Sequence, residues 1–407
     1  MTRLRSLLGV AATLAIVSHA NAVGTPGLGL DHAPDVDPLC RAACAWQTQV
    51  GADRNERLEA SIILDDGTIV VTGSTESTRY SGTAGWAFQV SGGGTLQWQR
   101  VVGASGSIVL EGLVQRSDGT LVLVGRAFFR EDSFGGHTDI LVVEMDRSGE
   151  VLNRWVVTAD GQQGATAVAM LPGGSLVLVG YAERAQGNRA ARVTLIGPDR
   201  SIAWEQVVDA PYGSTANDVA IVDGRIVVVG AARDLDRQAY AWLRSFAPDG
   251  TVLSNAVIAR GSRASATSLA GTDHGTVVVG GLQQDDGDMA GFVAEYSLDA
   301  EEAWSRRFLA PEGTDARIED VAFARDGSLI VAGEIAEDGV VMRLNGAEVA
   351  WENRYGTTTG RDTLTGVAEL SNGDIVATGW ITNRRDGMRN TDAWVIRVGM
   401  PGLMPTP

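Results

Sequence analysis

The sequence predicts an all-β protein, a seven-bladed β-propeller whose blades each contain four antiparallel strands. Three observations lead to this prediction. A segment of roughly 50 residues recurs seven times, each copy reads as four strands, and the two ends of the chain supply complementary parts of one copy.

The recurring segment is clearest at an apolar run that follows a turn and closes on glycine. Examples are DDGTIVVTG (65–73), SDGTLVLVG (117–125) and VDGRIVVVG (222–230). The closing glycines of the seven copies are Gly73, Gly125, Gly180, Gly230, Gly280, Gly333 and Gly379, with 46 to 55 residues between neighbours. Such regular spacing indicates one structural unit repeated seven times.

The fourth copy illustrates the four strands of one unit. Residues 217–222 form the first predicted strand, and Asp223-Gly224 provides a hairpin turn. Residues 225–232 are apolar at nearly every position, as expected for a strand covered on both faces. Residues 240–247 and 251–258 supply the third and fourth strands around a Pro-Asp-Gly turn.

The ends of the chain indicate how the ring closes. The last copy provides three strands and no fourth, whereas AWQTQVG (45–51) is a fourth strand with no copy before it. We therefore expect residues 45–51 to complete the C-terminal blade. A stacked solenoid is the alternative, but it would need polar capping repeats at its ends.

Fourth strands carry a tryptophan in five blades, where we expect it to pack between neighbouring blades: Trp46, Trp98, Trp204, Trp304 and Trp351. Asn153 and Ser254 occupy this position in blades 2 and 4.

The first 22 residues have the pattern of a secretory signal peptide, with cleavage predicted after Ala22. We expect residues 23–44 to be an N-terminal segment, 45–399 a single propeller domain, and 400–407 a tail. The apolar run of the leader is too short for a membrane span. The predicted location is therefore secreted or periplasmic. A net charge of −17 argues against nucleic acid as a partner.

Several segments resemble the SBBP-type bacterial β-propeller repeats: GTIVVTGSTES (67–77), TDILVVEMDRSGE (138–150) and TDAWVIRV (391–398). Ala and Gly replace the usual aspartate before the third strand in blades 1, 3 and 5. The resemblance implies a secreted seven-bladed propeller and no particular reaction. The turns also resemble quinoprotein dehydrogenases, but those enzymes have eight blades and usually vicinal cysteines, so we predict no cofactor.

Candidate ligand-binding residues lie in loops that a propeller places on one face. Here we call this side, which carries the loops between second and third strands and those between blades, the loop face. The candidates are Phe128, Phe129, Phe134 and His137 in blade 2, and Trp380, Arg384 and Arg385, with Arg389 nearby, in blade 7. Alternatively, the first two phenylalanines continue a buried strand, and the arginines balance Asp386 and Asp392.

Polar residues near the start of the inner strands are candidates for the channel mouth. Glu59, Glu111 and Glu319 would give it an acidic lining, with Thr166, Asn217, Thr267 and Thr365 at equivalent positions.

Cys40 and Cys44 are expected to form a disulfide, because an exported protein folds in an oxidising compartment. Two thiols binding metal are the alternative, but that needs two more ligands, so no metal site is predicted. Asp285, Asp286 and Asp288 read as a solvated acidic turn, with a calcium loop as the alternative.

Together these features predict a monomeric, exported binding or scaffold module with a protein or polysaccharide ligand. The alternative is a carbohydrate-active hydrolase or lyase that uses loop-face carboxylates.

Overall fold

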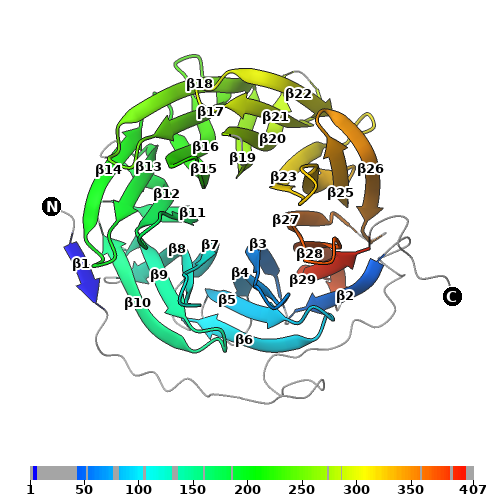
Figure 1. Ribbon diagram of the computed structural model, residues 1–407, viewed down its shortest axis with the longest axis horizontal. Coiled ribbons are helices and arrows are strands. Elements are labelled where there is room, and N and C mark those ends of the chain that lie inside the picture. Colours follow the sequence, from blue (N-terminus) through cyan, green and yellow to red (C-terminus); the bar gives the residue numbers. More distant parts are fainter. Residues whose placement is uncertain are drawn as a thin grey trace.

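The computed structural model describes residues 3–6, 44–51, 54–76, 82–103, 107–130, 136–158, 161–184, 187–272, 275–285, 287–357, 360–385 and 388–399. In these ranges the chain forms seven antiparallel sheets arranged as blades around one axis (Figure 1). The prediction of an all-β, seven-bladed propeller is confirmed. No helix in the described ranges is long and apolar enough to cross a membrane.

The first four blades follow one another along the chain. Blade 1 contains β3 (Glu56–Ile63), β4 (Ile69–Glu76), β5 (Thr83–Val90) and β6 (Leu96–Val102). Blade 2 contains β7 (Ile108–Gln115), β8 (Leu121–Arg130), β9 (Gly136–Met145) and β10 (Val151–Thr158). Blade 3 contains β11 (Gln163–Met170), β12 (Leu176–Glu183), β13 (Arg189–Ile196) and β14 (Ile202–Val208). Blade 4 contains β15 (Ser214–Val222), β16 (Arg225–Arg233), β17 (Ala239–Phe246) and β18 (Val252–Gly261).

The last three blades complete the ring. Blade 5 contains β19 (Arg263–Gly271), β20 (Thr276–Gln284), β21 (Ala290–Ser297) and β22 (Glu302–Phe308). Blade 6 contains β23 (Ala316–Phe323), β24 (Leu329–Ile335), β25 (Asp338–Asn345) and β26 (Glu348–Tyr355). Blade 7 contains β27 (Thr363–Glu369), β28 (Ile375–Arg385) and β29 (Met388–Val398), and its fourth strand is β2 (Cys44–Val50).

The two ends of the described chain meet in blade 7. Strand β2 runs antiparallel to β29, with Trp46 opposite Arg397 and Gln49 opposite Trp394 (Figure 1). The outer edge of blade 2 carries one further short strand, β1 (Arg3–Ser6), which pairs with β10. This strand falls within the predicted leader.

The hydrophobic core is divided among the joints between blades. Seven clusters of buried side chains occur in the described residues, and each joins two neighbouring blades. The second strands contribute most, because both of their faces are covered. This burial explains why the second strand gives the most visible repeat in the sequence.

Each inner strand has a β-bulge at the same place, with one extra residue: Glu59, Glu111, Thr166, Asn217, Thr267, Glu319 and Thr365. The bulge lies against a glycine of the second strand: Gly73, Gly125, Gly180, Gly230, Gly281, Gly333 or Gly379. A Cβ on any of these glycines would come within 1.9–2.3 Å of an inner-strand carbonyl oxygen, so a larger residue does not fit.

The alignment from sequence was wrong by one residue in blade 5, where it chose Gly280. Gly281 pairs with Ala266, before the bulge, whereas Gly280 pairs with Ser268, after it. Because VVVGG contains two consecutive glycines, the sequence pattern alone does not distinguish them.

Bulge residues link neighbouring inner strands in four of the seven joints. In each case the side chain donates a hydrogen bond to the carbonyl just before the next bulge. These bonds are Thr166 Oγ1 to Ala216 O (2.7 Å), Asn217 Nδ2 to Ala266 O (2.7 Å), Thr267 Oγ1 to Ile318 O (2.7 Å) and Thr365 Oγ1 to Leu58 O (2.8 Å). Glutamate occupies the bulge in the other three blades.

The five outer-strand tryptophans pack against clusters that join two blades, as the sequence predicted. Three of them contact a turn of the next blade, whereas Trp304 Nε1 donates to Glu295 in its own blade. The indole nitrogens of Trp46, Trp98 and Trp204 donate to the carbonyls of Gly92, Arg147 and Pro248, respectively. In blade 4, Ser254 Oγ donates to Leu298 O at 3.0 Å, in the corresponding turn of blade 5. A serine therefore retains the hydrogen bond but not the ring packing.

We expect a chain that begins at Asp53 to melt far lower than one that begins at Val23, or to aggregate. The shorter chain lacks β2, which leaves the edge of β29 unpaired. Thermal unfolding of the two chains, with light scattering, measures the difference. Equal melting temperatures would mean that β2 is dispensable for the ring.

Gly149→Ala should destabilise the protein more than Gly373→Ala. Both glycines have positive φ (80° and 89°), so each substitution should cost about 1–2 kcal/mol of strain. Only at Gly149 would the new Cβ also lie 2.7 Å from the Trp98 ring, which should add roughly 1–3 kcal/mol. Denaturant unfolding measures both free energies, and equal losses would contradict the role given to the Trp98 contact.

Candidate functional site

A pocket of about 540 Å³ lies on the loop face between blades 3, 4 and 5. Its walls come from strand ends and adjoining loops. Arg189 is the first residue of β13, Arg233 the last of β16, and Arg263 the first of β19. The connection that carries Tyr212 lies between β14 and β15. Four loops of three successive blades therefore converge on one site.

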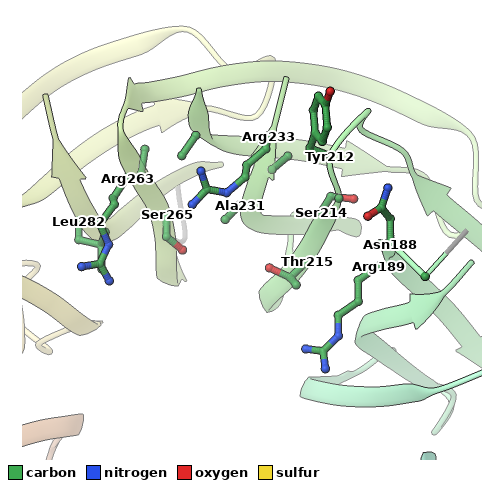
Figure 2. Close-up of a pocket in the computed structure, with 15 residues that line it drawn as sticks. Asn188, Arg189, Tyr212, Ser214, Thr215, Ala231, Arg233, Arg263, Ser265 and Leu282 are labelled. Atoms are coloured by element: carbon green, nitrogen blue, oxygen red, sulfur yellow. The ribbon is translucent and has the colours of Figure 1, made fainter. Parts of the chain in front are cut away.

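Three arginines and no carboxylate line this pocket. This is unusual in a chain with 50 acidic and 33 basic residues. Figure 2 shows the side chains of Arg189, Arg233 and Arg263 extending around the open space, with Arg233 pointing toward Arg263 and Ser265. The lining of this pocket is thus basic, although the protein as a whole has a net charge of −17.

Within the described part of the chain, none of the three arginines forms an ion pair. The Arg189 guanidinium lies over the Tyr181 ring at 4.0 Å, and Arg233 Nη1 donates to Arg237 O at 3.2 Å. Arg263 is exposed, and no hydrogen bond joins its side chain to another described residue. All three guanidinium groups therefore have donors left for a ligand.

Three other arginines of the loop face have carboxylate partners, whereas Arg237 lies over the Tyr212 ring at 4.9 Å and forms no ion pair with another described residue. Arg260 contacts Asp234 at 3.1 Å, and Arg307 contacts Asp285 at 3.3 Å. Arg184 pairs with Asp209. Among the described residues, the three pocket arginines differ from Arg260, Arg307 and Arg184 in having no carboxylate partner.

The rest of the lining combines small apolar and polar side chains. Ala231 and Ala264 make room, and the exposed ring of Tyr212 forms part of the rim. Ser265 Oγ accepts a hydrogen bond from the bulge residue Asn217 at 2.9 Å. The wall of the pocket is therefore tied to the inner strands.

The predicted acidic residues of the channel mouth occupy bulges of blades 1, 2 and 6. Glu111 forms an ion pair with Arg126, and Glu319 Oε1 lies 3.9 Å from Arg317 Nε. Burial is the main cause that raises the pKa of Glu59, and burial raises the pKa of Glu319 to about 7. Arg317 opposes the rise in the pKa of Glu319, whereas Glu334 and then Glu59 add to it.

Two further carboxyls follow the bulges of blades 4 and 6. Burial raises the pKa of Asp218 to about 7 and that of Asp320 to about 6. Asp218 accepts the backbone N–H of Leu269, and Asp320 accepts the Ser268 hydroxyl and the N–H of Val367. Both aspartates therefore connect one inner strand to the next. No group of described residues has the arrangement needed to hold a metal ion.

Three of the residues predicted in blade 2, Phe128, Phe129 and His137, lie on the loop face outside the pocket. Phe128 is exposed, and Phe129 stacks at 5.7 Å on His137 across the hairpin. His137 Nε2 lies 3.1 Å from the buried carboxylate of Asp139. Phe134 lies outside the described residues. A ligand role for this group stays a prediction.

The predicted blade 7 residues are on the same face and also outside the pocket. Arg57 lies over the Trp380 ring at 5.9 Å. In the backbone register of the β28–β29 hairpin, Arg384 lies opposite Arg389 and Arg385 lies opposite Met388. Their ligand role stays a prediction.

The cysteine and aspartate predictions fall partly outside the described residues. Cys44 begins β2, but Cys40 is not among these residues, so the disulfide stays a prediction. Asp285 contacts Arg307, and Asp288 accepts the Gly313 N–H at 2.7 Å, while Asp286 lies outside. The two described carboxylates thus have protein partners.

Sequence reasoning did not identify Arg189, Arg233 and Arg263, because they are 30 to 44 residues apart in three blades. A signal was available: each arginine stands at the loop-face end of a strand, and the strand ends come from the repeat. What the sequence could not show is which neighbouring arginines have carboxylate partners.

The sequence matches no model of a known protein family, and no curated protein matches it. Solved structures share its fold. The Neurospora crassa Pan2 WD40 domain has a TM-score of 0.50 and 12% identity, over 86% of this chain and 95% of that one. Drosophila Plexin A in complex with Semaphorin 1b has a TM-score of 0.50 and 8% identity, over 86% and 88%. A protein from Lactobacillus plantarum has a TM-score of 0.50 and 14% identity, over 79% and 94%. At these identities the likeness shows the propeller fold alone.

The buried carboxyls predict that stability falls as pH rises. In the folded protein Glu319 keeps its proton up to about pH 7, whereas in the unfolded chain it titrates near pH 4.5. The folded state therefore binds more protons between these values, and the free energy of unfolding decreases across this window. Glu319→Gln should reduce the decrease by on the order of 1–3 kcal/mol, because its neutral amide needs no proton. Melting temperatures of the wild type and the variant at pH 5 and pH 8 measure this loss of stability.

Glu312→Gln, at an exposed loop position, is the matched control and should keep the wild-type pH dependence. If Glu319→Gln and Glu312→Gln have the same slope between pH 5 and pH 8, Glu319 is not a source of the pH dependence.

Proposed function

We propose that the protein is an exported bacterial β-propeller of the SBBP type that binds a protein or polysaccharide through the pocket on its loop face. The pocket between blades 3 and 5 is the observation that carries this proposal. Its volume lies in the range of small-ligand sites, and its polar groups converge from separate loops on a fixed frame.

The fold supports a binding role. Propellers present many loops on one face of a rigid ring, and ligands are recognised by the loops. Plexin A, which has a similar fold, was solved in complex with another protein, Semaphorin 1b. The leader pattern of residues 1–22 supports export, and we propose that the mature protein acts as a monomer.

The carbohydrate-active enzyme has less support at this pocket. Glycosidic hydrolysis generally needs a pair of carboxyl groups on either side of the scissile bond. The residues that line the pocket include no aspartate or glutamate. A binding role therefore fits the lining better than hydrolysis does.

The test is a screen of polysaccharides, oligosaccharides and proteins by thermal shift and calorimetry, repeated with Ala231→Trp, which fills the pocket. We expect a ligand that the wild type binds and that this variant binds at least about tenfold more weakly. Asn372→Trp, on an exposed turn at the opposite face, should bind like the wild type. A ligand whose affinity is the same for all three proteins would place binding elsewhere.

A further inference from the structure

The pocket between blades 3 and 5 combines two properties that together indicate its ligand chemistry. It is lined by three arginines without ion pairs in the described chain, and it contains no carboxylate. Guanidinium groups bind carboxylate and related anions through paired, charge-assisted hydrogen bonds. An anionic ligand would supply the missing counter-charge.

The bulge residues of the inner strands differ between the blades that carry the pocket and three of the other blades. Glutamate fills the bulge in blades 1, 2 and 6, whereas uncharged Thr166, Asn217 and Thr267 fill it in blades 3, 4 and 5. The arginine pocket lies over the blades with neutral bulges. The bulge residues beneath the pocket therefore bring no carboxylate to it.

The remaining lining favours a saccharide over an acidic peptide. Asn188 is half-buried, and no hydrogen bond joins its side chain to another described residue. Thr215 and Ser265 add hydroxyl groups, and the exposed Tyr212 adds a ring with an amphipathic edge. Leu282 is the one large aliphatic residue in the lining. A peptide would find few apolar contacts here, whereas sugar hydroxyls would find polar partners.

We propose that the pocket binds a carboxylate-bearing segment of an acidic polysaccharide, with Arg189, Arg233 and Arg263 as the anion-binding residues. This inference rests on the proposed binding function and specifies its ligand class. The arginines stand at strand ends of three successive blades, so a chain of sugars that crosses these blades can place acid groups beside each of them in turn.

The experiment compares oligogalacturonate with its fully methyl-esterified form, which has the same sugar units without the charge. We expect the acid form to bind, the ester to bind at least about tenfold more weakly, and the affinity of the acid form to fall as salt rises. Arg189→Gln, Arg233→Gln and Arg263→Gln should each weaken binding by about tenfold or more. Arg307→Gln, which alters a paired arginine of the same face, should not. Melting temperatures verify that each variant is folded.

Three results would overturn the inference. Equal binding of acid and ester, with Ala231→Trp abolishing both, would keep the pocket as a binding site and exclude anion recognition. Polyglutamate that binds as tightly as oligogalacturonate, with the same sensitivity to the arginine variants, would make the ligand an acidic peptide. If Arg307→Gln weakens binding of the acid form as much as the pocket variants do, the acid form binds through the overall charge of the face and not through the pocket. If no polysaccharide or protein in the wider screen binds the pocket, the proposed function itself fails.

Discussion

The ring depends on one repeated contact, in which a bulge of the inner strand lies against a glycine of the second strand. The bulge turns a backbone carbonyl toward the Cα of that glycine, and any Cβ there would meet the oxygen at 1.9–2.3 Å. The contact recurs in all seven blades, so each inner strand bends at the same height. This bend places the bulge residue where its side chain can reach the next blade.

Because the bulge lies at a joint between blades, its side chain determines whether a hydrogen bond joins the two inner strands and whether an acidic group lies at the joint. Threonine and asparagine donate to the neighbouring carbonyl at 2.7–2.8 Å. At the glutamate bulges of blades 1, 2 and 6 the described residues form no such hydrogen bond, and Glu111 pairs with Arg126. An apolar cluster spans each of these three joints, and in the joint of blades 6 and 7 Asp320 also accepts the N–H of Val367.

The sequence was sufficient for the fold because seven copies repeat the same physical requirements. Apolar second strands and turn glycines recur in all seven copies, outer-strand tryptophans recur in five, and the bulge residues fall at equivalent positions. The predicted glycine was wrong in blade 5, where Gly280 and Gly281 are consecutive and the pattern fits both. The site was not predicted, because the sequence does not show that Arg189, Arg233 and Arg263 come together without a carboxylate partner among the described residues. That property depends on loop geometry, which the repeat does not encode.

The repeat therefore separates two functions within one chain. Residues that recur, such as Gly73 and Gly125, maintain the ring and have little freedom to change. Loop-face residues that do not recur can vary without cost to the frame, and here they produce a basic pocket in a protein of net charge −17. A local charge opposite to that of the whole protein leaves guanidinium groups unpaired on a rigid surface. In the free protein Arg189 contacts the Tyr181 ring and Arg233 contacts the Arg237 carbonyl, but neither contact neutralises the guanidinium charge, and this is the physical reason to assign these groups to a ligand.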